Sequence, residues 1–561
     1  MRFALCFVSA TSAGVLLSCA HRTPASVVPH LVSPAPIGVA APKATARLVV
    51  LVVLDQLASW VLDKYLPVLD ENGALRRGVA QGAFHRVSYP YSSTYTAPGH
   101  AALVTGVPPA ENGVMANELY DRAMGKAMPC ASDRSAPVLL DPEATASPAI
   151  LKAQTVGDAL WEATHGKAHV VSISLKDRSA VLSGGKHAEL ALFYDPAIGG
   201  YTTSEYYAKA LPDFLTAWSA AHPIGEWLAA WTPLDAGLLA RVAGKDDAPG
   251  EGDWDGLGTT FPHDPRTSAH PSSTFRATPQ ASDELFALAS EVVDRTALGQ
   301  DDVPDLLVVS VSGTDYVGHV FGPDSWEYLD NLRRVDRALA AFVDRLSARG
   351  PTAFLVTADH GVVPLPERTL AEGRPAGRFL EGDMKRALAD AAARELGHAE
   401  WVVAVKAPFV YLAPEATTPE RRSTSFAVIV RALESMPGIF AAYDVKDLAA
   451  HHPSDDPIRA AASLSVDASL DADLLFIPKP GYLVDSGIVP GKGTNHGTPW
   501  PYDREVPVIF WGAGVTPHAK GTETFDALRV APTLAALLGS PSPSSARGQP
   551  LPGAPPLVAA R

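Results

Sequence analysis

The chain has 561 residues, of which 47% are hydrophobic and 19% charged, and its formal net charge is −15. This composition is typical of a globular protein with one large domain or a few ordinary ones. The negative charge argues against nucleic acid or an acidic membrane surface as the main partner, and an anionic substrate would need a local positive site.

Residues 1–19 predict an export signal. A single basic residue precedes an apolar run that is too short to span a bilayer, and the run ends in Leu-Leu-Ser-Cys at 16–19. This ending resembles a bacterial lipobox, so we expect a periplasmic protein or one anchored in the outer membrane by a lipid on Cys19; plain cleavage is the alternative. Residues 20–45, rich in Pro, Ala, Ser and Val, predict a flexible tether.

Apolar runs predict strands buried on both faces, and helical periodicity lies between them. The strand runs are 47–54, 169–174, 305–311, 352–357 and 506–511, and the clearest helical repeats are at 285–292 and 328–346. This alternation predicts an α/β fold, an open and mostly parallel sheet with helices on both faces. Ligands of such sheets bind beyond the carboxyl ends of the strands.

Two stretches break the alternation. Residues 183–282 interleave Trp with Gly, Pro and Asp, and we interpret them as a cap inserted over the site. Residues 378–485 are predicted to be a second insertion with its own helices and strands. The catalytic domain then covers 46–540, and the Pro-rich residues 541–561 are predicted to be a loose tail.

The stretch from Ser92 to His100 predicts a loop that enters a helix, with Thr96 as N-cap and Pro98 in the first turn. A hydroxyl there lies near free amides and the positive end of the helix, which stabilise a phosphate or an alkoxide that attacks one. The alternative is that Thr96 only caps the helix.

Aspartate and histidine residues gather at predicted strand ends and in one glycine-flanked loop. They are Asp55, Asp315, His319, Asp359, His360 and His496. Asp315 and His319 are four residues apart, so both can reach one point from a single helical turn. Each residue alone could be a helix cap or a chance loop residue, but the set, together with the Thr96 motif, is one that suits zinc.

As a set, these motifs resemble the alkaline phosphatase superfamily, most closely its branch of type I phosphodiesterases and PafA-type alkaline phosphatases. The resemblance covers the chain from about Leu48 to Gly539 and is carried by Leu54-Asp55-Gln56, Thr94-Tyr95-Thr96-Ala97-Pro98-Gly99-His100, Asp315-x3-His319, Asp359-His360-Gly361 and His496-Gly497.

The resemblance implies two zinc ions. One would be held by Asp315, His319 and His496. The other would be held by Asp55, Asp359 and His360, with Thr96 bound to it as the nucleophile. It also implies that Thr96 forms a phosphothreonine intermediate, which water then hydrolyses.

A second motif, Ser174-Leu175-Lys176-Asp177-Arg178, distinguishes between the branches. In the phosphatases that it resembles, a Lys-x-Arg pair and an Asn, here Lys176, Arg178 and Asn117, contact the non-bridging phosphate oxygens. A monoester dianion has one more charged oxygen than a diester, and Arg can bind it bidentately. The alternative is that Lys176 and Arg178 form a solvated strand end.

We therefore predict a zinc-dependent alkaline phosphatase that hydrolyses small phosphate monoesters of broad structure and releases inorganic phosphate. One alternative is a phosphodiesterase or nucleotide pyrophosphatase that uses the same two-metal site. Another, of a different class, is an inactive metal-binding surface lipoprotein. We expect no nucleic-acid partner, no membrane contact except through Cys19, and a monomer.

Overall fold

The computed structural model describes residues 46–558, so the predicted export signal, the tether and Cys19 lie outside the described residues. Among the helices of residues 46–558, none is long and apolar enough to cross a membrane.

The core of the structure is a nine-stranded sheet with the order β19-β2-β18-β11-β1-β10-β7-β8-β9. Its strands are β1 (Leu48–Leu54), β2 (Ala83–Ser88), β7 (Val170–Ser174), β8 (Leu190–Asp195), β9 (Gly200–Thr202), β10 (Asp305–Val311), β11 (Thr352–Thr357), β18 (Glu505–Gly512) and β19 (Lys520–Asp526). The strands from β11 to β8 are parallel, whereas β18 and β9 run antiparallel to their neighbours. The predicted mostly parallel sheet is confirmed.

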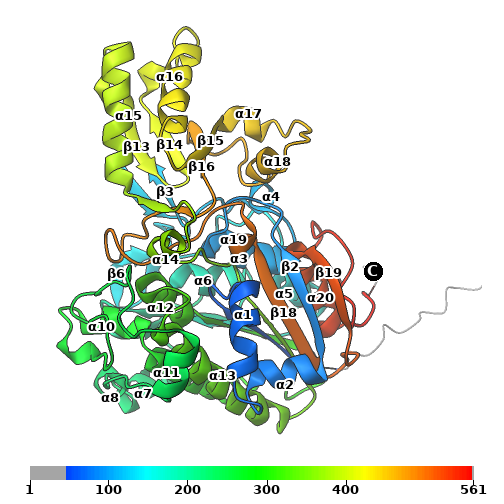
Figure 1. Ribbon diagram of the computed structural model, residues 1–561. Coiled ribbons are helices and arrows are strands. Elements are labelled where there is room, and N and C mark those ends of the chain that lie inside the picture. Colours follow the sequence, from blue (N-terminus) through cyan, green and yellow to red (C-terminus); the bar gives the residue numbers. More distant parts are fainter. Residues whose placement is uncertain (1–45, 559–561) are drawn as a thin grey trace, which may run out of the picture. The chain divides into compact units, whose positions relative to one another are not determined.

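Helices flank this sheet (Figure 1). They include α1 (Ser59–Tyr65), α2 (Ala74–Gln81), α3 (Thr96–Thr105), α5 (Val156–Ala163), α6 (Asp177–Gly184), α11 (Pro279–Arg295), α12 (Gly313–Phe321), α13 (Trp326–Ser347) and α20 (Val530–Leu538). Every residue of β1 is buried, because its apolar side chains point alternately to two covered faces. The predicted helices at 285–292 and 328–346 are parts of α11 and α13.

Residues 381–478 form a lobe with a sheet of its own, in the order β13-β14-β16-β15. Its elements include α15 (Glu381–Leu396), β13 (Val402–Lys406), β14 (Phe409–Leu412), α16 (Arg422–Glu434), β15 (Ile439–Asp444) and β16 (Leu474–Pro478). The chain enters and leaves the lobe through β12 (Gly377–Phe379) and β17 (Tyr482–Val484), which pair in parallel. These elements occupy the second insertion predicted at 378–485 and have a separate hydrophobic core.

The structure corrects the start of the cap predicted at 183–282. The strands β8 and β9 within this stretch belong to the main sheet. Part of the remainder packs beside α13, where the buried Trp231 donates a hydrogen bond from Nε1 to Asp330 Oδ2 at 2.7 Å. Trp231, one of the tryptophans that suggested a separate cap, therefore attaches the segment to the main domain.

The stretch after Ser540, predicted to be loose, is packed at 549–552. Leu551 is buried, and its N–H donates to Thr533 Oγ1 in α20 at 2.9 Å. Arg529 donates to the carbonyl oxygens of Gln549 and Pro550. The buried Leu551 and these hydrogen bonds thus hold residues 549–552 against the main domain.

Candidate metal centre and active site

Parallel strands bring the predicted polar residues to one edge of the sheet. Asp55 follows β1, Lys176 follows β7, Asp315 lies in α12 just after β10, and Asp359 and His360 follow β11. His496 comes from the loop between β17 and α19 (Pro501–Arg504). Because β1 lies between β10 and β11, Asp55 is flanked by the two segments that carry the other aspartates.

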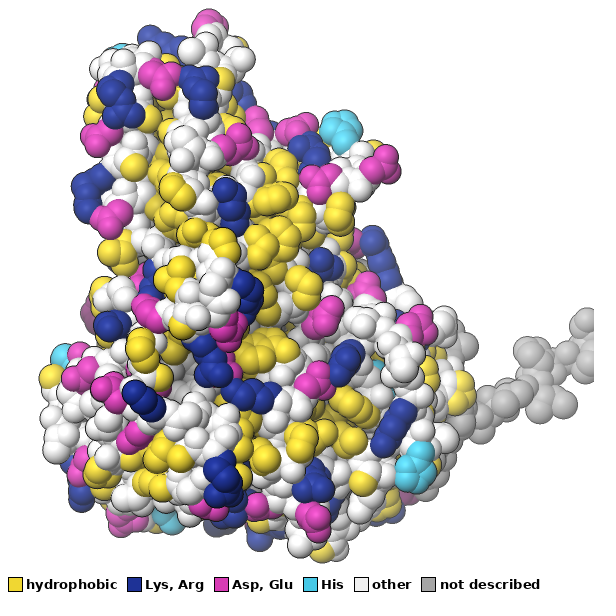
Figure 2. All heavy atoms as spheres, in the orientation of Figure 1, with side chains coloured by type: hydrophobic (Ala, Val, Ile, Leu, Met, Phe, Trp, Pro, Cys, Tyr) yellow, Lys and Arg dark blue, Asp and Glu magenta, His cyan; other side chains and the backbone are white. Residues whose placement is uncertain are grey.

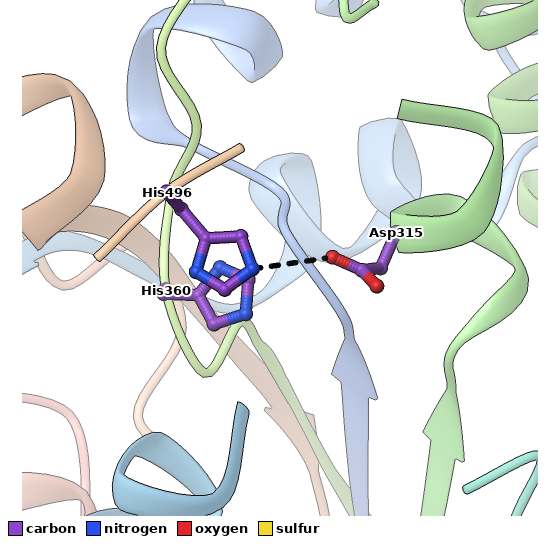
Figure 3. A group of neighbouring side chains, drawn as sticks. All are labelled: Asp315, His360 and His496. Carbon is purple, nitrogen blue, oxygen red and sulfur yellow. Dashed lines mark ion pairs between the residues drawn. The ribbon is translucent and has the colours of Figure 1, made fainter. Parts of the chain in front are cut away.

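All six predicted ligands come together, and all are buried. His360 Nε2 lies 3.3 Å from Asp55 Oδ1 and 3.4 Å from Asp359 Oδ2. Asp315 Oδ1 lies 3.1 Å from His319 Nε2 and 3.7 Å from His496 Nε2. The rings of His360 and His496 stack with centroids 3.5 Å apart, so the two groups adjoin (Figure 3).

The structure groups the donor atoms slightly differently from the resemblance. Within 4.8 Å of one another lie donor atoms of Asp55, Asp359 and His360, and also of Asp315, His360 and His496. The first group is the predicted set. In the second, His360 takes the place predicted for His319, which lies beside it through its contact with Asp315.

The three histidines are oriented as metal ligands are. Each ring contacts a backbone carbonyl oxygen through Nδ1: His319 contacts Thr494 at 2.8 Å, His360 contacts Gly361 at 2.9 Å, and His496 contacts Thr94 at 2.7 Å. A carbonyl oxygen only accepts hydrogen bonds, so Nδ1 carries a proton and a neutral ring has its Nε2 lone pair free. In all three rings, Nε2 is the atom that faces a carboxylate.

The carboxylates also fit a bound cation. Asp55 Oδ1 and Asp359 Oδ2 are buried and accept no hydrogen bond from the described residues. The ring nitrogen His100 Nδ1 lies 3.2 Å from Asp359 Oδ2, but it contacts the Thr96 carbonyl oxygen at 2.9 Å. Buried carboxylate oxygens without donors are unfavourable unless a cation binds them, and a set of Asp and His donors suits zinc.

The electrostatics of the cluster are dominated by burial and by Lys176. Burial would raise the pKa of Asp55, but the Lys176 ammonium, 2.7 Å from Asp55 Oδ2, holds that pKa below its usual range. Burial and the Asp55 carboxylate raise the pKa of Asp359. Burial opposes the charged form of His360, yet Asp359 and Asp55 raise the pKa of His360 to about 9. The aspartates thus attract positive charge to His360 Nε2.

Thr96 is the first residue of α3, and the N-cap is Tyr95, one residue earlier than predicted. No side chain caps α3, so the alternative that Thr96 only caps the helix is not supported. Its Oγ1 lies 3.4 Å from both His360 Nε2 and Lys176 Nζ. The backbone of α3 lies close to the backbone at Asp359, and Gly99 makes this possible. A Cβ at Gly99 would come within 2.2 Å of the Asp359 carbonyl oxygen.

A cavity of about 290 Å³ opens onto Thr96, and Asn117, Lys176 and Arg178 line it. Lys176 is 3% exposed, so it is not part of a solvated strand end. The Arg178 side chain is 26% exposed, but its Nε is buried without a hydrogen-bond partner among the described residues. Asn117 Oδ1 accepts the N–H of Ala97 at 2.8 Å, which leaves its amide N–H groups for a ligand.

Sequence reasoning missed several residues of the site. Tyr316 lines the cavity with its ring 5.2 Å from Lys176 Nζ, and Glu381 and Lys406 of the lobe line the cavity as well. Gln56 contacts two of the aspartates. Tyr316 and Gln56 follow predicted ligands directly, but nothing in the local sequence of Lys406 indicated that the lobe reaches the site.

Comparisons with known proteins show the family of this chain. The model of the family "Type I phosphodiesterase / nucleotide pyrophosphatase" matches residues 49–499. Alkaline phosphatase PafA of Elizabethkingia meningoseptica is 28% identical over 525 residues, which are 90% of this chain and 94% of PafA. Alkaline phosphatase PhoV of Synechococcus elongatus is 30% identical over 526 residues, 90% of this chain and 92% of PhoV.

The crystal structure of wild-type PafA superposes on this chain with a TM-score of 0.83. The superposition covers 91% of this chain and 99% of PafA, at 28% sequence identity. The similarity therefore includes both the main sheet and most of the inserted segments.

Proposed function

Because the chain belongs to the type I phosphodiesterase / nucleotide pyrophosphatase family, we propose that it is a phosphate monoester hydrolase, an alkaline phosphatase that acts through two zinc ions. Relatives that are named alkaline phosphatases match it over about nine tenths of its length. The observation that carries the proposal is the position of the Thr96 hydroxyl. Its Oγ1 lies 3.4 Å from His360 Nε2, in the cluster of aspartates and histidines, and 3.4 Å from Nζ of the buried Lys176.

Zinc would be held in two places. Asp315, His319 and His496 would hold one ion. Asp55, Asp359, His360 and the Thr96 oxygen would hold the other. Bound zinc supplies Lewis-acid stabilisation of negative charge on the attacking and leaving oxygens. The free Nε2 lone pairs and the carboxylate oxygens without donors support this assignment.

Thr96 Oγ1 would attack the phosphorus in line with the ester oxygen. A Thr96–phosphorus bond forms, the ester P–O bond breaks, and the alcohol leaves with the proton of the Thr96 hydroxyl. Water then attacks the phosphothreonine, which releases inorganic phosphate and restores the hydroxyl. Lys176 Nζ, 3.4 Å from Oγ1, would stabilise the negative charge of the attacking oxygen.

Asn117, Lys176 and Arg178 would bind the non-bridging oxygens and favour monoesters over diesters. The contacts that they offer are directed at the phosphoryl group, which supports broad specificity for the alcohol. With a net charge of −15, an anionic substrate needs local positive charge. Lys176, Arg178 and Lys406 supply cations in the cavity, where acidic side chains are present as well, and bound zinc would add to them. On the face in Figure 2, acidic and basic side chains are interspersed.

The test is a comparison of kcat/KM for an aryl phosphate monoester and the matching diester, with zinc-loaded enzyme. We expect the monoester to be preferred, and a Lys176→Ala/Arg178→Ala variant to lose about 10²-fold or more on the monoester, since each charge-assisted contact contributes about 1.5–3 kcal/mol. The loss on the diester should be smaller, because the diester lacks the extra charged oxygen and loses only the contact of Lys176 with the attacking oxygen. Lys167→Ala, which removes an exposed charge before β7, should change neither value.

Other outcomes identify the alternatives. A preference for the diester, unchanged in the double variant, would make the protein a phosphodiesterase that uses the same metal site. Zinc binding without hydrolysis of either ester would make it an inactive metal-binding protein.

Export is part of the proposal and is supported by the sequence of residues 1–19. We propose a periplasmic enzyme or one anchored in the outer membrane by a lipid on Cys19, and a monomer. Cys19→Ser should abolish metabolic labelling with a fatty acid and release the protein from the membrane fraction. Light scattering of the purified enzyme measures its oligomeric state.

A further inference from the structure

Gln56 has an unusual backbone conformation beside the metal site. It directly follows Asp55, is fully buried, and has a φ of 71°. This left-handed conformation is unfavourable for a residue with a Cβ atom and persists where surrounding contacts enforce it. Contacts of Gln56 with its surroundings must therefore stabilise this conformation.

Two hydrogen bonds fulfil this requirement. The backbone N–H of Gln56 donates to Asp359 Oδ1 at 3.2 Å, and its side-chain Nε2 donates to Asp315 Oδ1 at 2.7 Å. The amide orientation follows from the partner, because the reverse orientation would place Oε1 against a carboxylate oxygen. One residue thus contacts an aspartate from each of the two predicted zinc sites.

Gly318 leaves the space that the Gln56 side chain occupies. It lies in α12 between Asp315 and His319, and a Cβ at this position would be 1.8 Å from Gln56 Oε1. Glycine is a poor helix former, so its place within α12 has a local cost. A larger residue at this position would therefore displace the amide of Gln56.

We propose that Gln56 is a positioning residue for both metal sites, and that Gly318 is required for its placement. The bond to Asp359 Oδ1 leaves Oδ2 facing His360 Nε2, and the amide bond fixes the carboxylate of Asp315 beside His319 and His496. The inference rests on the proposed function, because it concerns the orientation of the ligands of the same zinc ions.

The two bonds can be separated by substitution. Gln56→Gly keeps the backbone N–H that contacts Asp359, accommodates the positive φ, and removes only the amide that contacts Asp315. The variant should therefore weaken zinc at the Asp315 site and leave zinc at the Asp359 site unchanged. Gly318→Ala should also weaken zinc at the Asp315 site, because its methyl group displaces the Gln56 amide although Gln56 itself is unchanged.

The experiment is a chelator titration of the full zinc-loaded chain, with retained zinc measured by elemental analysis. In both variants we expect one of two zinc ions to be released at an about 10- to 100-fold lower chelator concentration than in the wild type, with the second unchanged. The loss of kcat/KM on an aryl monoester should be reversed by excess zinc. Gln154→Gly, which removes two exposed hydrogen bonds, one to Glu162 and one from the Ser544 N–H, is the matched control and should release zinc as the wild type does.

Release of both ions at wild-type chelator concentrations in both variants would overturn the inference, as would equal weakening of both ions. A residue with only a structural role would lower the melting temperature without changing the release of either ion. Failure of the wild-type chain to bind zinc would instead reject the proposed function, so the two failures are distinguishable.

Discussion

The Thr96 hydroxyl lies between His360 and Lys176. A variant without this hydroxyl tests the proposed chemistry directly. Thr96→Ala should lower kcat on an aryl monoester by about 10³-fold or more, because no other nucleophile is then attached to the enzyme. Thr96→Ser should retain much of the activity. Acid-quenched wild-type enzyme should carry a phosphoryl group on Thr96 by mass spectrometry. Turnover by Thr96→Ala with its zinc intact would show that water attacks the substrate directly.

Glu284 in α11 links stability to pH. It is 3% exposed, and burial raises its pKa from 4.5 to about 8. A carboxyl with a raised pKa is protonated in the folded state but ionised in the unfolded chain between these values, so its stabilisation is present at low pH and is lost as pH rises from about 4.5 to 8. The slope is about 1.4 kcal/mol per pH unit for one group.

Glu284→Gln should therefore be more stable than the wild type at pH 8, and the difference should shrink towards pH 5. Thermal unfolding at a series of pH values measures it. Glu291→Gln, on the same helix and paired with Arg295, is the control and should give a difference that varies much less with pH. A difference independent of pH for Glu284→Gln would place its pKa near the ordinary value.

The residues of the site differ in how far the sequence could predict them. Asp55 and Asp359 could be predicted because each follows an apolar run, and parallel strands end at one edge. The role of Gln56 could not, since its partners Asp359 and Asp315 lie 303 and 259 residues away and its positive φ has no local signal. Side-chain contacts between distant segments become visible only in the folded chain.

At the scale of elements, the hairpin of β13 and β14 carries Lys406 to the mouth of the cavity. Lys406 Nζ lies 2.7 Å from Glu118 Oε2 in β3 (Glu118–Asp121) and 3.7 Å from Glu381 Oε2 at the start of α15. Glu118 directly follows Asn117. The lobe thus forms a wall of the cavity next to a predicted phosphate-binding residue.

Lys406→Ala would leave Glu118 and Glu381 without a cation at the mouth of the cavity. Their charge should repel a dianionic monoester and raise its KM about fivefold at low salt, with a smaller change in kcat and a smaller effect at high salt. Steady-state kinetics at two ionic strengths measure this effect. Lys152→Ala, which removes an ion pair with Asp467 away from the cavity, is the control. An unchanged KM at low salt would mean that the hairpin does not contact the path of the substrate.

The start of the predicted cap at 183–282 shows what helical and strand periodicity cannot predict. Its short strands β8 and β9 and its tryptophans indicate burial, but not the neighbour against which they are buried. Trp254 packs with its ring 5.8 Å from that of Tyr316, so the segment contacts a residue that lines the cavity. The lobe at 381–478 adds Glu381, Lys406 and Ala407 to the lining of the cavity, and the sequence predicted the lobe as an insertion without indicating this contact.

At the scale of the whole molecule, the five most apolar strands could be predicted, but β2, β8, β9 and β19 were missed and the order of the strands could not be predicted. The burial of each run is a local property, whereas the order β11-β1-β10-β7-β8 depends on pairing between runs up to several hundred residues apart. That order places Asp55 in the middle, with the segments that carry Asp315 and Asp359 on either side. The metal centre is therefore a consequence of the topology of the sheet.

Ligands from so many segments should couple zinc binding to the stability of the whole domain. The predicted ligands lie between Asp55 and His496 and follow three strands of the main sheet, so an ion that binds them holds together elements that are distant in sequence. At a free zinc concentration 1,000 times the dissociation constant, one site stabilises the folded state by about 4 kcal/mol. A strong chelator should thus lower the melting temperature by several degrees, and excess zinc should restore it.

Asp315→Asn, which weakens one site and also removes the buried ion pair with Lys176, should lose about half of this zinc-dependent shift when each protein is compared with its own chelated form. Differential scanning fluorimetry at fixed protein concentration, with zinc content measured in parallel, separates the two effects. If chelation removes zinc without changing the melting temperature, the ligands are held in place by the sheet alone. The ion would then contribute to the chemistry of the site and not to the stability of the fold.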